Sequence, residues 1–182
     1  MGRITSVSLS PSIDKYIEFD RFALGATNRV RHTHSDGSGK AINVALSAKA
    51  LGIEADCIGL LGEGGSLLIK RLDRVGVQHE FFSAPGEVRV NQKLFDRSTG
   101  ITTEINESAP EAPQELLDEV MELAEKKAVS SDILVFSGSL PQHCPVSWYA
   151  DAIRAVHDRN PDCRCVLDAE GEKLTLGVAE HP

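Results

Sequence analysis

The stretch "CIGLLGEGGSLLIKRLDRV", residues 57–75, joins two different hydrophobic patterns, and this junction decides the fold class. Its first six residues are small or apolar without alternation, which is typical of a short strand buried on both faces of a sheet. In its second half, Leu67, Leu68, Leu72 and Val75 recur at helical spacing. A buried strand that runs into a helix is the repeating unit of α/β proteins.

The same alternation continues on both sides of this stretch. Three further strands are expected in the apolar runs "ITSVSLS" (4–10), "ILVFSGS" (133–139) and "CRCVLD" (163–168). Helices are expected over 40–51 and 64–75, and after Pro113 and Pro145, since proline suits the first turn of a helix. The sequence therefore predicts a doubly wound, mostly parallel sheet with helices on both faces.

Two segments interrupt the alternation and read as extended chain. Residues 12–34 form two runs joined around Leu24 and Gly25, and residues 87–106 form a hairpin that turns between Asp96 and Gly100. In the hairpin, a period of two separates apolar Val88, Val90 and Leu94 from polar Arg89, Asn91 and Lys93. This alternation fits either a solvated sheet face or a small inserted sheet that covers a polar ligand.

We expect the inserted segments to form a unit of their own. The α/β core is assigned to residues 1–11, 35–84 and 107–182, and a β lid to residues 12–34 and 85–106. If the chain is part of a longer protein, the core is incomplete and lacks strands that should flank those present. An unpaired edge at the last strand, 163–168, follows from that expectation.

Composition excludes several classes of protein. The 182 residues are 41% apolar and 25% charged, as in globular proteins, and the net charge of −8 does not fit a nucleic-acid-binding surface. We see no signal peptide and no run long enough to span a membrane. The cysteines form no C-x-x-C pair, so a zinc site is not expected. We expect a reducing, cytoplasmic location.

The segment "SDGSGKAINVA", residues 35–45, looks like a phosphate-binding loop but fails the known templates. A Walker loop would need glycine at His34 and serine or threonine at Ala41, and no G-x-G-x-x-G follows the first strand. What remains is a loop that presents backbone N–H groups and Lys40 at a helix N-terminus, where an anion or a hydroxyl would be stabilised. Alternatively, Ser38 is only the N-cap of that helix.

Five motifs in a fixed order resemble the ribokinase-like (PfkB) carbohydrate kinases, and within them the 1-phosphofructokinase and tagatose-6-phosphate kinase branch. The motifs are "SLSPSID" (8–14), "GSGKAIN" (37–43), "TEINES" (103–108), "SGSLP" (137–141) and "LDAEGEKL" (167–174). The resemblance implies the same α/β core with a β lid that the hydrophobic pattern predicts.

The resemblance also implies roles for individual residues. Asp14 would accept hydrogen bonds from sugar hydroxyls, and Arg89 would bind the phosphate already on the substrate. The other implied sugar-site residues are Gly39, Lys40, Asn43, Lys93 and Ser139. A carboxylate repels a phosphate and an arginine fork matches one, so Asp14 and Arg89 should engage opposite ends of the ligand.

Some parts of the family pattern are absent or changed. No G-x-G-D segment, which in the family carries the anion hole and the catalytic base, occurs in these residues. We therefore assign no catalytic residue and no metal ligand here, and expect this chain alone to be inactive, with ATP and Mg²⁺ used by a longer enzyme. Ser38, Ala41, Ala109 and His143 stand where the family usually has glycine.

Three hypotheses follow. The first is an ATP-dependent kinase that converts fructose 1-phosphate to fructose 1,6-bisphosphate, with no nucleic-acid or membrane partner. The second is a non-catalytic module that binds sugar phosphates or dimerises, and a homodimer through the lid face with Val88, Val90 and Ile105 is expected. The third, a dinucleotide-dependent oxidoreductase, lacks the fingerprint after the first strand.

Overall fold

The computed structural model describes residues 2–182 and contains two sheets. Five parallel strands form the larger sheet in the order β5-β4-β1-β8-β9. Its strands are β1 (Arg3–Ser8), β4 (Glu54–Glu63), β5 (Gln78–Glu87), β8 (Ile133–Ser137) and β9 (Arg164–Asp168). The α/β fold expected from the sequence is thus confirmed.

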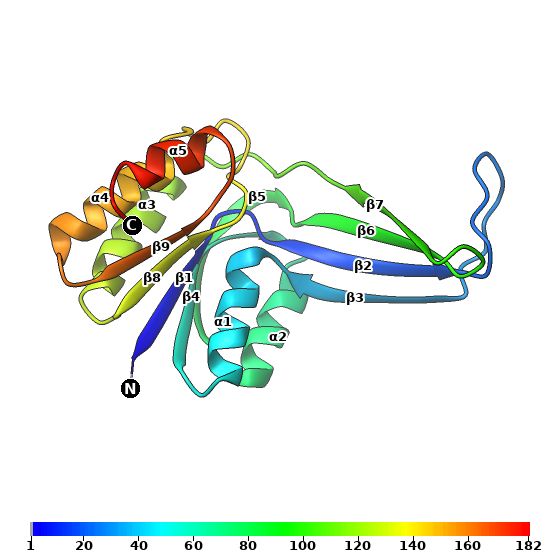
Figure 1. The fold of residues 1–182 in the computed structure, drawn as a ribbon, viewed down its shortest axis with the longest axis horizontal. Coiled ribbons are helices and arrows are strands. Elements are labelled where there is room, and N and C mark those ends of the chain that lie inside the picture. The colour runs from blue at the N-terminus through cyan, green and yellow to red at the C-terminus, as the bar shows by residue number, and fades with distance from the viewer. Residues whose placement is uncertain (1) are drawn as a thin grey trace.

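Helices cover both faces of the larger sheet (Figure 1). Two helices pack on one face, α1 (Lys40–Ala50) and α2 (Ser66–Val75). The other face carries α3 (Gln114–Ala128), α4 (Trp148–Arg159) and α5 (Glu172–Val178). Each layer therefore has its own apolar core, one centred on Ile42 and Leu68 and the other on Phe136 and Trp148.

Not every strand has both faces covered. Six consecutive residues of β4 are buried between the two helical layers, but Val166 on β9 is 47% exposed. β9 lies at the edge of the sheet, so its outer side has no strand partner among residues 2–182. The expectation that the last strand is buried on both faces was wrong, because α1 lies against β1 and β4 and α2 against β5, which leaves that face of β9 uncovered.

The second sheet has four strands and extends away from the core as an arm (Figure 1). Its order is β3-β2-β6-β7, with bounds β2 (Ser12–Phe19), β3 (His32–Ser38), β6 (Arg89–Asp96) and β7 (Ile101–Asn106). The β6–β7 pair is the expected hairpin, and the turn at Leu24 and Gly25 lies between β2 and β3. We call this four-stranded sheet the lid.

The strands do not end where the hydrophobic pattern placed the domain boundaries. β3 continues in the lid to Ser38, and β5 continues in the larger sheet to Glu87. The division into two domains stays a prediction. Val88 was also placed wrongly on the lid's apolar face, since it is only 5% exposed and packs in the core with Leu68.

The helices of residues 2–182 were compared with the requirements for crossing a membrane. No described helix combines the length and the apolar character that a membrane crossing requires.

Candidate functional site

The polar motifs gather where the strands of the larger sheet end. The carboxyl ends of β1, β8 and β9 lie at one edge, and the chain passes from β1 directly into the lid at Ser12. β4 and β5 lie on one side of β1, and β8 and β9 lie on the other, so the strand order reverses direction at β1. Ligands of open α/β sheets bind at such a switch point.

Asp14 on β2 is the most heavily bonded side chain at this edge. Its Oδ2 accepts from Ser38 Oγ at 3.1 Å and lies 3.3 Å from Lys93 Nζ, and its Oδ1 accepts from Asn91 Nδ2 at 3.2 Å. Partial burial opposes the charged form, but the bonds from Ser38, Lys93 and Asn91 outweigh it and lower the pKa of Asp14 below its ordinary value of 3.8. Asp14 is therefore a permanent carboxylate at neutral pH.

Strand register explains why these side chains meet. Asp14 pairs with Asp36 on β3 and with Asn91 on β6, and Tyr16 pairs with Lys93. Since alternate residues of a strand share a face, all of them point to the same side of the lid. The expected separation of polar from apolar residues in the hairpin is thus present in the structure.

A cavity of about 340 Å³ opens on this polar side of the lid. Its volume falls within the range of small-molecule pockets. Eight residues from the lid, α1 and α2 line it: Asp14, Tyr16, His34, Asp36, Ser38, Asn43, Arg71 and Lys93. We call it the lid cavity.

Lys40 belongs to a second cluster beside the lid cavity. Its Nζ lies 3.0 Å from Oδ1 of Asp168 at the end of β9, whose Oδ2 accepts from Ser137 Oγ at 2.9 Å. The bonds from Lys40 and then Ser137 lower the pKa of Asp168. Asn43 lines both the lid cavity and a neighbouring hollow that Lys40 and Asp168 share, so α1 connects the two clusters.

The glycine loop brings the start of α1 close to the strand β1. Gly39 has a φ of 133°, and a Cβ there would lie 3.3 Å from Pro11 Cα. Only glycine fits this conformation without strain. The alternative role of Ser38 as an N-cap was wrong, because Gly39 is the N-cap and the Ser38 hydroxyl bonds Asp14 instead.

Comparisons with known proteins identify the family of this chain. The profile described as pfkB family carbohydrate kinase matches residues 7–181. The chain belongs to this family.

Its relatives include two sugar-phosphate kinases by name. A 1-phosphofructokinase of Bacillus subtilis is 31% identical over 98% of this chain and 57% of its own length. A tagatose-6-phosphate kinase of Staphylococcus epidermidis is 28% identical over 94% of this chain and 54% of its own. The chain thus spans about half the length of the curated relatives it matches.

Solved structures give the same result for the fold. A tetrameric inhibited form of phosphofructokinase-2 from Escherichia coli superimposes with a TM-score of 0.88 at 25% identity. The match covers 98% of this chain and 58% of that one.

Four predicted site residues of this pfkB-family chain do not line the lid cavity, namely Gly39 and Lys40, described above, and Arg89 and Ser139. Arg89 donates from Nη2 to the Ser10 carbonyl at 3.2 Å, and its buried Nε has no partner within residues 2–182. Burial lowers the pKa of Arg89, while the nearby Asp14 opposes that change. Ser139 follows Gly138 in the turn after β8, and no hydrogen bond from its side chain occurs in the described chain.

Several residues of the site were not foreseen from the sequence. Asp36 and Arg71 line the lid cavity. Asn91 donates a hydrogen bond to Asp14, and Ser137 donates one to Asp168. Asn91 and Asp36 lie directly opposite Asp14 on the neighbouring strands, so a correct strand pairing would have predicted both of them. Arg71 lies in a helix whose pattern only identifies an apolar face, so no sequence signal singles it out.

His143 stands apart from the site. It adopts a φ of 61° in the loop after Pro141, and its Nε2 lies 3.1 Å from Glu111 Oε1. Such a conformation suits the glycine that the family pattern has here. His143 is thus an exposed loop residue and not part of the lid cavity.

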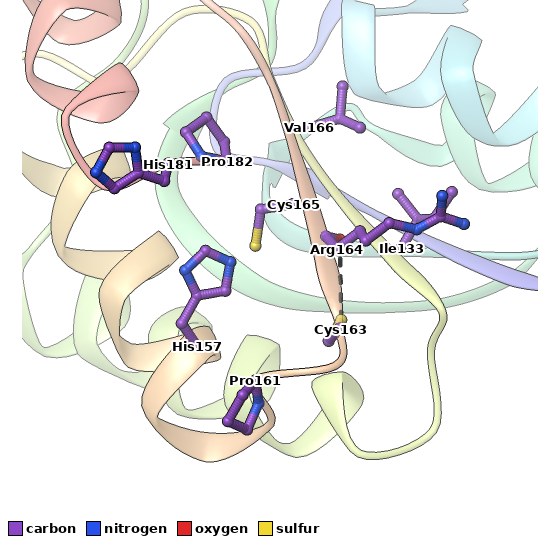
Figure 2. A pocket seen from close by; sticks show the side chains of 9 residues that line it. All are labelled: Ile133, His157, Pro161, Cys163, Arg164, Cys165, Val166, His181 and Pro182. Carbon is purple, nitrogen blue, oxygen red and sulfur yellow. Dashed lines mark hydrogen bonds between the residues drawn. The ribbon is translucent and has the colours of Figure 1, made fainter.

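A larger cavity, about 550 Å³, lies elsewhere, beside the edge strand β9 (Figure 2). In the figure His157 and His181 approach β9 near Cys165, while the Arg164 side chain extends away from them. It holds no carboxylate, so it lacks the opposite charges that converge in the lid cavity. We therefore place the candidate site in the lid cavity.

The described residues 2–182 do not form a metal site. No group of three or more His, Cys, Asp or Glu side chains among them has the geometry to hold an ion. Asp14 and Asp168 each use both carboxylate oxygens on lysine, serine or asparagine donors. The residues present thus do not fit a Mg²⁺ ion.

Proposed function

We propose that this chain forms the phosphosugar site of an ATP-dependent kinase that converts fructose 1-phosphate to fructose 1,6-bisphosphate. The observation that carries the proposal is Asp14, a carboxylate held ionised in a cavity that also contains cationic side chains. Family membership supports a carbohydrate kinase, and the names of the relatives support a phosphorylated sugar as substrate.

Each site residue then has a role that follows from its chemistry. Asp14 accepts hydrogen bonds from sugar hydroxyls, and the loop residues Gly39, Lys40 and Asn43 hold the ring. Arg89 and Lys93 stabilise the phosphate already present, and Ser139 contacts the sugar from the turn after β8. ATP and Mg²⁺ would supply the transferred phosphoryl group and screen its charge.

The 182 residues alone are proposed to bind phosphosugar without transferring a phosphoryl group. General-base assistance contributes roughly 10²- to 10⁴-fold to such reactions, and no described side chain is assigned that task. A cytoplasmic location is part of the proposal and agrees with the four free thiols in the structure.

Substitution of Asp14 tests the proposal. Asp14→Asn removes the charge but keeps the shape, and charge-assisted hydrogen bonds contribute roughly 1.5–3 kcal/mol each. We expect the Kd for fructose 1-phosphate, measured by calorimetry, to rise roughly 10- to 100-fold. Asp20→Asn is the control, since Asp20 is exposed on the lid and pairs only with Arg31.

Three ligands make the test specific. Fructose 1-phosphate, fructose 6-phosphate and tagatose 6-phosphate should be titrated in parallel, and fructose 1-phosphate is expected to bind most tightly. Absence of saturable binding for all three would contradict the proposal.

One observation favours a second candidate, a non-catalytic module that binds sugar phosphate and dimerises. Ile101 and Ile105 on the outer face of the lid are 61% and 50% exposed, as in a surface that another chain covers. This candidate predicts a cooperative thermal melt that phosphosugars raise and ATP leaves unchanged. A shift of the melt by ATP alone would exclude it.

A further inference from the structure

Arg71 reaches the lid cavity from α2, a helix to which neither the sequence motifs nor the family pattern assigned a role. The loop carrying Gly37 packs so closely on α2 that a Cβ on Gly37 would lie 2.5 Å from Leu68 Cα. This contact places the next turn of α2, with Arg71, at the wall of the cavity. The Arg71 Nη1 group donates to the Gly37 carbonyl, so the guanidinium is anchored.

The charges inside the cavity distinguish Arg71 from the other cation. Lys93 Nζ lies 3.3 Å from Asp14, so part of its charge is already offset by a carboxylate. The second carboxylate, Asp36, lies 3.7 Å from His34 Nε2. Arg71 forms no ion pair with any carboxylate of residues 2–182, and its described partner is a neutral carbonyl.

We infer that Arg71 is a further ligand of the substrate phosphate, in addition to Arg89 and Lys93, and thereby increases specificity for phosphorylated over free sugars. This inference rests on the proposed function of the same cavity. A guanidinium has five N–H donors in a planar fork that matches phosphate oxygens, and the bond to Gly37 leaves most of them available. Because that bond fixes the fork in advance, less side-chain freedom is lost when a phosphate binds.

The placement also orients the ligand. Asp14 and Asp36 lie opposite each other on adjacent strands of the lid, and both repel a phosphate. A sugar hydroxyl donates to a carboxylate, whereas a phosphate oxygen accepts from a cation. The phosphate is therefore directed toward α2 and the hydroxyls toward β2 and β3.

The test compares two variants, Arg71→Met and Arg71→Lys, with the control Arg74→Met. Arg74 suits the control because it is exposed on the same helix and does not line the cavity. Fructose 1-phosphate, inorganic phosphate and free fructose are titrated into each protein and followed by NMR chemical shifts. We expect Arg71→Met to weaken binding of both phosphate ligands roughly 10- to 100-fold, with Arg71→Lys between it and the wild type. Fructose binding should change less than about 2-fold in every variant.

Two outcomes would overturn the inference alone. Equal weakening of fructose and fructose 1-phosphate would show that Arg71 only anchors the Gly37 loop. Unchanged phosphate binding in Arg71→Met would show that the phosphate lies elsewhere. If the wild type binds no phosphosugar, the proposed function fails as well, so the two failures are distinguishable.

Discussion

At the scale of single residues, the site depends on how opposite charges are paired. Asp14 is partly buried, which by itself disfavours a carboxylate, yet three donors from two strands of the lid stabilise the charged form. The same donors fix its orientation. Asp14 is therefore ready to accept a hydroxyl without reorganisation, which is the advantage of a preorganised site.

The lowered pKa of Asp14 makes part of the folding stability dependent on acid pH. Its folded-state pKa lies below 3.8, so the stabilisation is present above that value and is lost as the pH falls through the folded pKa. We expect the free energy of unfolding to decrease more for the wild type than for Asp14→Asn between about pH 5 and about pH 2. Urea titrations of both proteins across this range measure the difference.

An equal decrease in both proteins would contradict this assignment. Asp96→Asn is a useful comparison, because Asp96 also has a lowered pKa, chiefly through Ser98, but lies at the end of β6 and does not line the lid cavity. Its substitution should leave the acid dependence of phosphosugar binding unchanged, whereas Asp14→Asn should remove it.

The residues of the site could be predicted from the sequence only in part. The motif "SLSPSID" identifies Asp14, and the alternation in the hairpin places Lys93 on the polar face beside it. The partner of Lys40 could not be predicted in this way, since Asp168 lies 128 residues further along the chain. Arg71 was missed because its role depends on the packing of α2 on Gly37, which no local pattern records.

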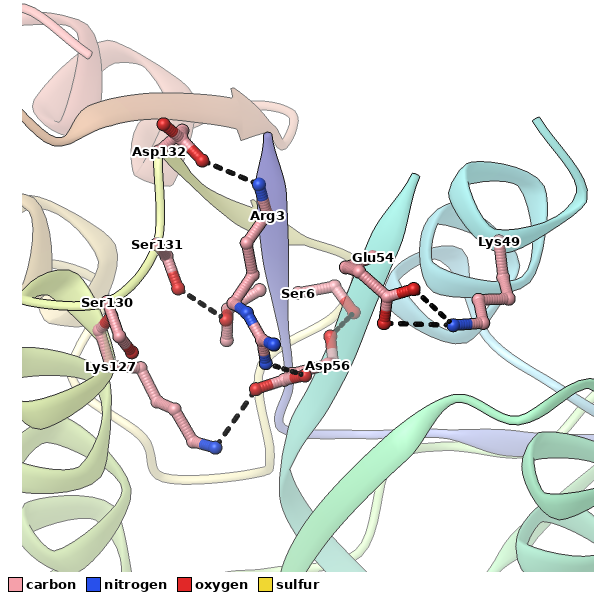
Figure 3. Close-up of polar contacts among 10 residues, drawn as sticks. Arg3, Ser6, Lys49, Glu54, Asp56, Lys127, Ser130, Ser131 and Asp132 are labelled. Carbon is pink, nitrogen blue, oxygen red and sulfur yellow. Dashed lines mark hydrogen bonds and ion pairs between the residues drawn. The ribbon is translucent and has the colours of Figure 1, made fainter. Parts of the chain in front are cut away.

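At the scale of elements, Asp56 on β4 links three parts of the core (Figure 3). It is 3% exposed, and its two carboxylate oxygens each lie 3.0 Å from a cation, Arg3 on β1 and Lys127 on α3. The cluster lies at the amino ends of β1 and β4, whereas the lid cavity lies beyond the carboxyl end of β1. We interpret it as a structural contact between the sheet and α3.

Removal of Asp56 should therefore destabilise the fold. Loss of one partner from a buried ion pair typically costs about 3–5 kcal/mol. We expect Asp56→Ala to lower the free energy of unfolding by about 3 kcal/mol, because Arg3 and Lys127 retain some exposure. Glu54→Ala on the same strand is the matched control, since the exposed pair of Glu54 with Lys49 should contribute less than about 1 kcal/mol. Denaturant unfolding of both variants measures the contrast, and similar losses would contradict it.

Two elements escaped the sequence pattern for identifiable reasons. β5 contains Pro85 and largely exposed residues, which is tolerated because β5 is an edge strand of the larger sheet. α5 has only seven residues and includes Gly177, so its helical period is too short to recognise. Gly177 also packs closely on β9, since a Cβ there would displace the end of the Leu167 side chain.

At the scale of the whole molecule, the lid is an arm with two different faces. Its polar face meets the core at the lid cavity, while its other face carries Leu94, Ile101 and Ile105 and borders a hollow of about 400 Å³ with Phe22 and Leu24. In Figure 1 the far end of the arm has no helix of this chain against it. An exposed apolar surface of this kind is typical of a contact between subunits.

We therefore expect the protein to dimerise through the apolar face of the lid. Ile105→Asp places a charge in this face and should raise the dimer dissociation constant at least about 10-fold, because a buried carboxylate without a partner is strongly disfavoured. Val129→Asp is the control, since Val129 is 61% exposed after α3 and lies away from the lid. Sedimentation velocity over a range of concentrations distinguishes the two. A wild type that stays monomeric, or a Val129→Asp variant that dissociates as readily as Ile105→Asp, would show that the apolar face of the lid is not the contact.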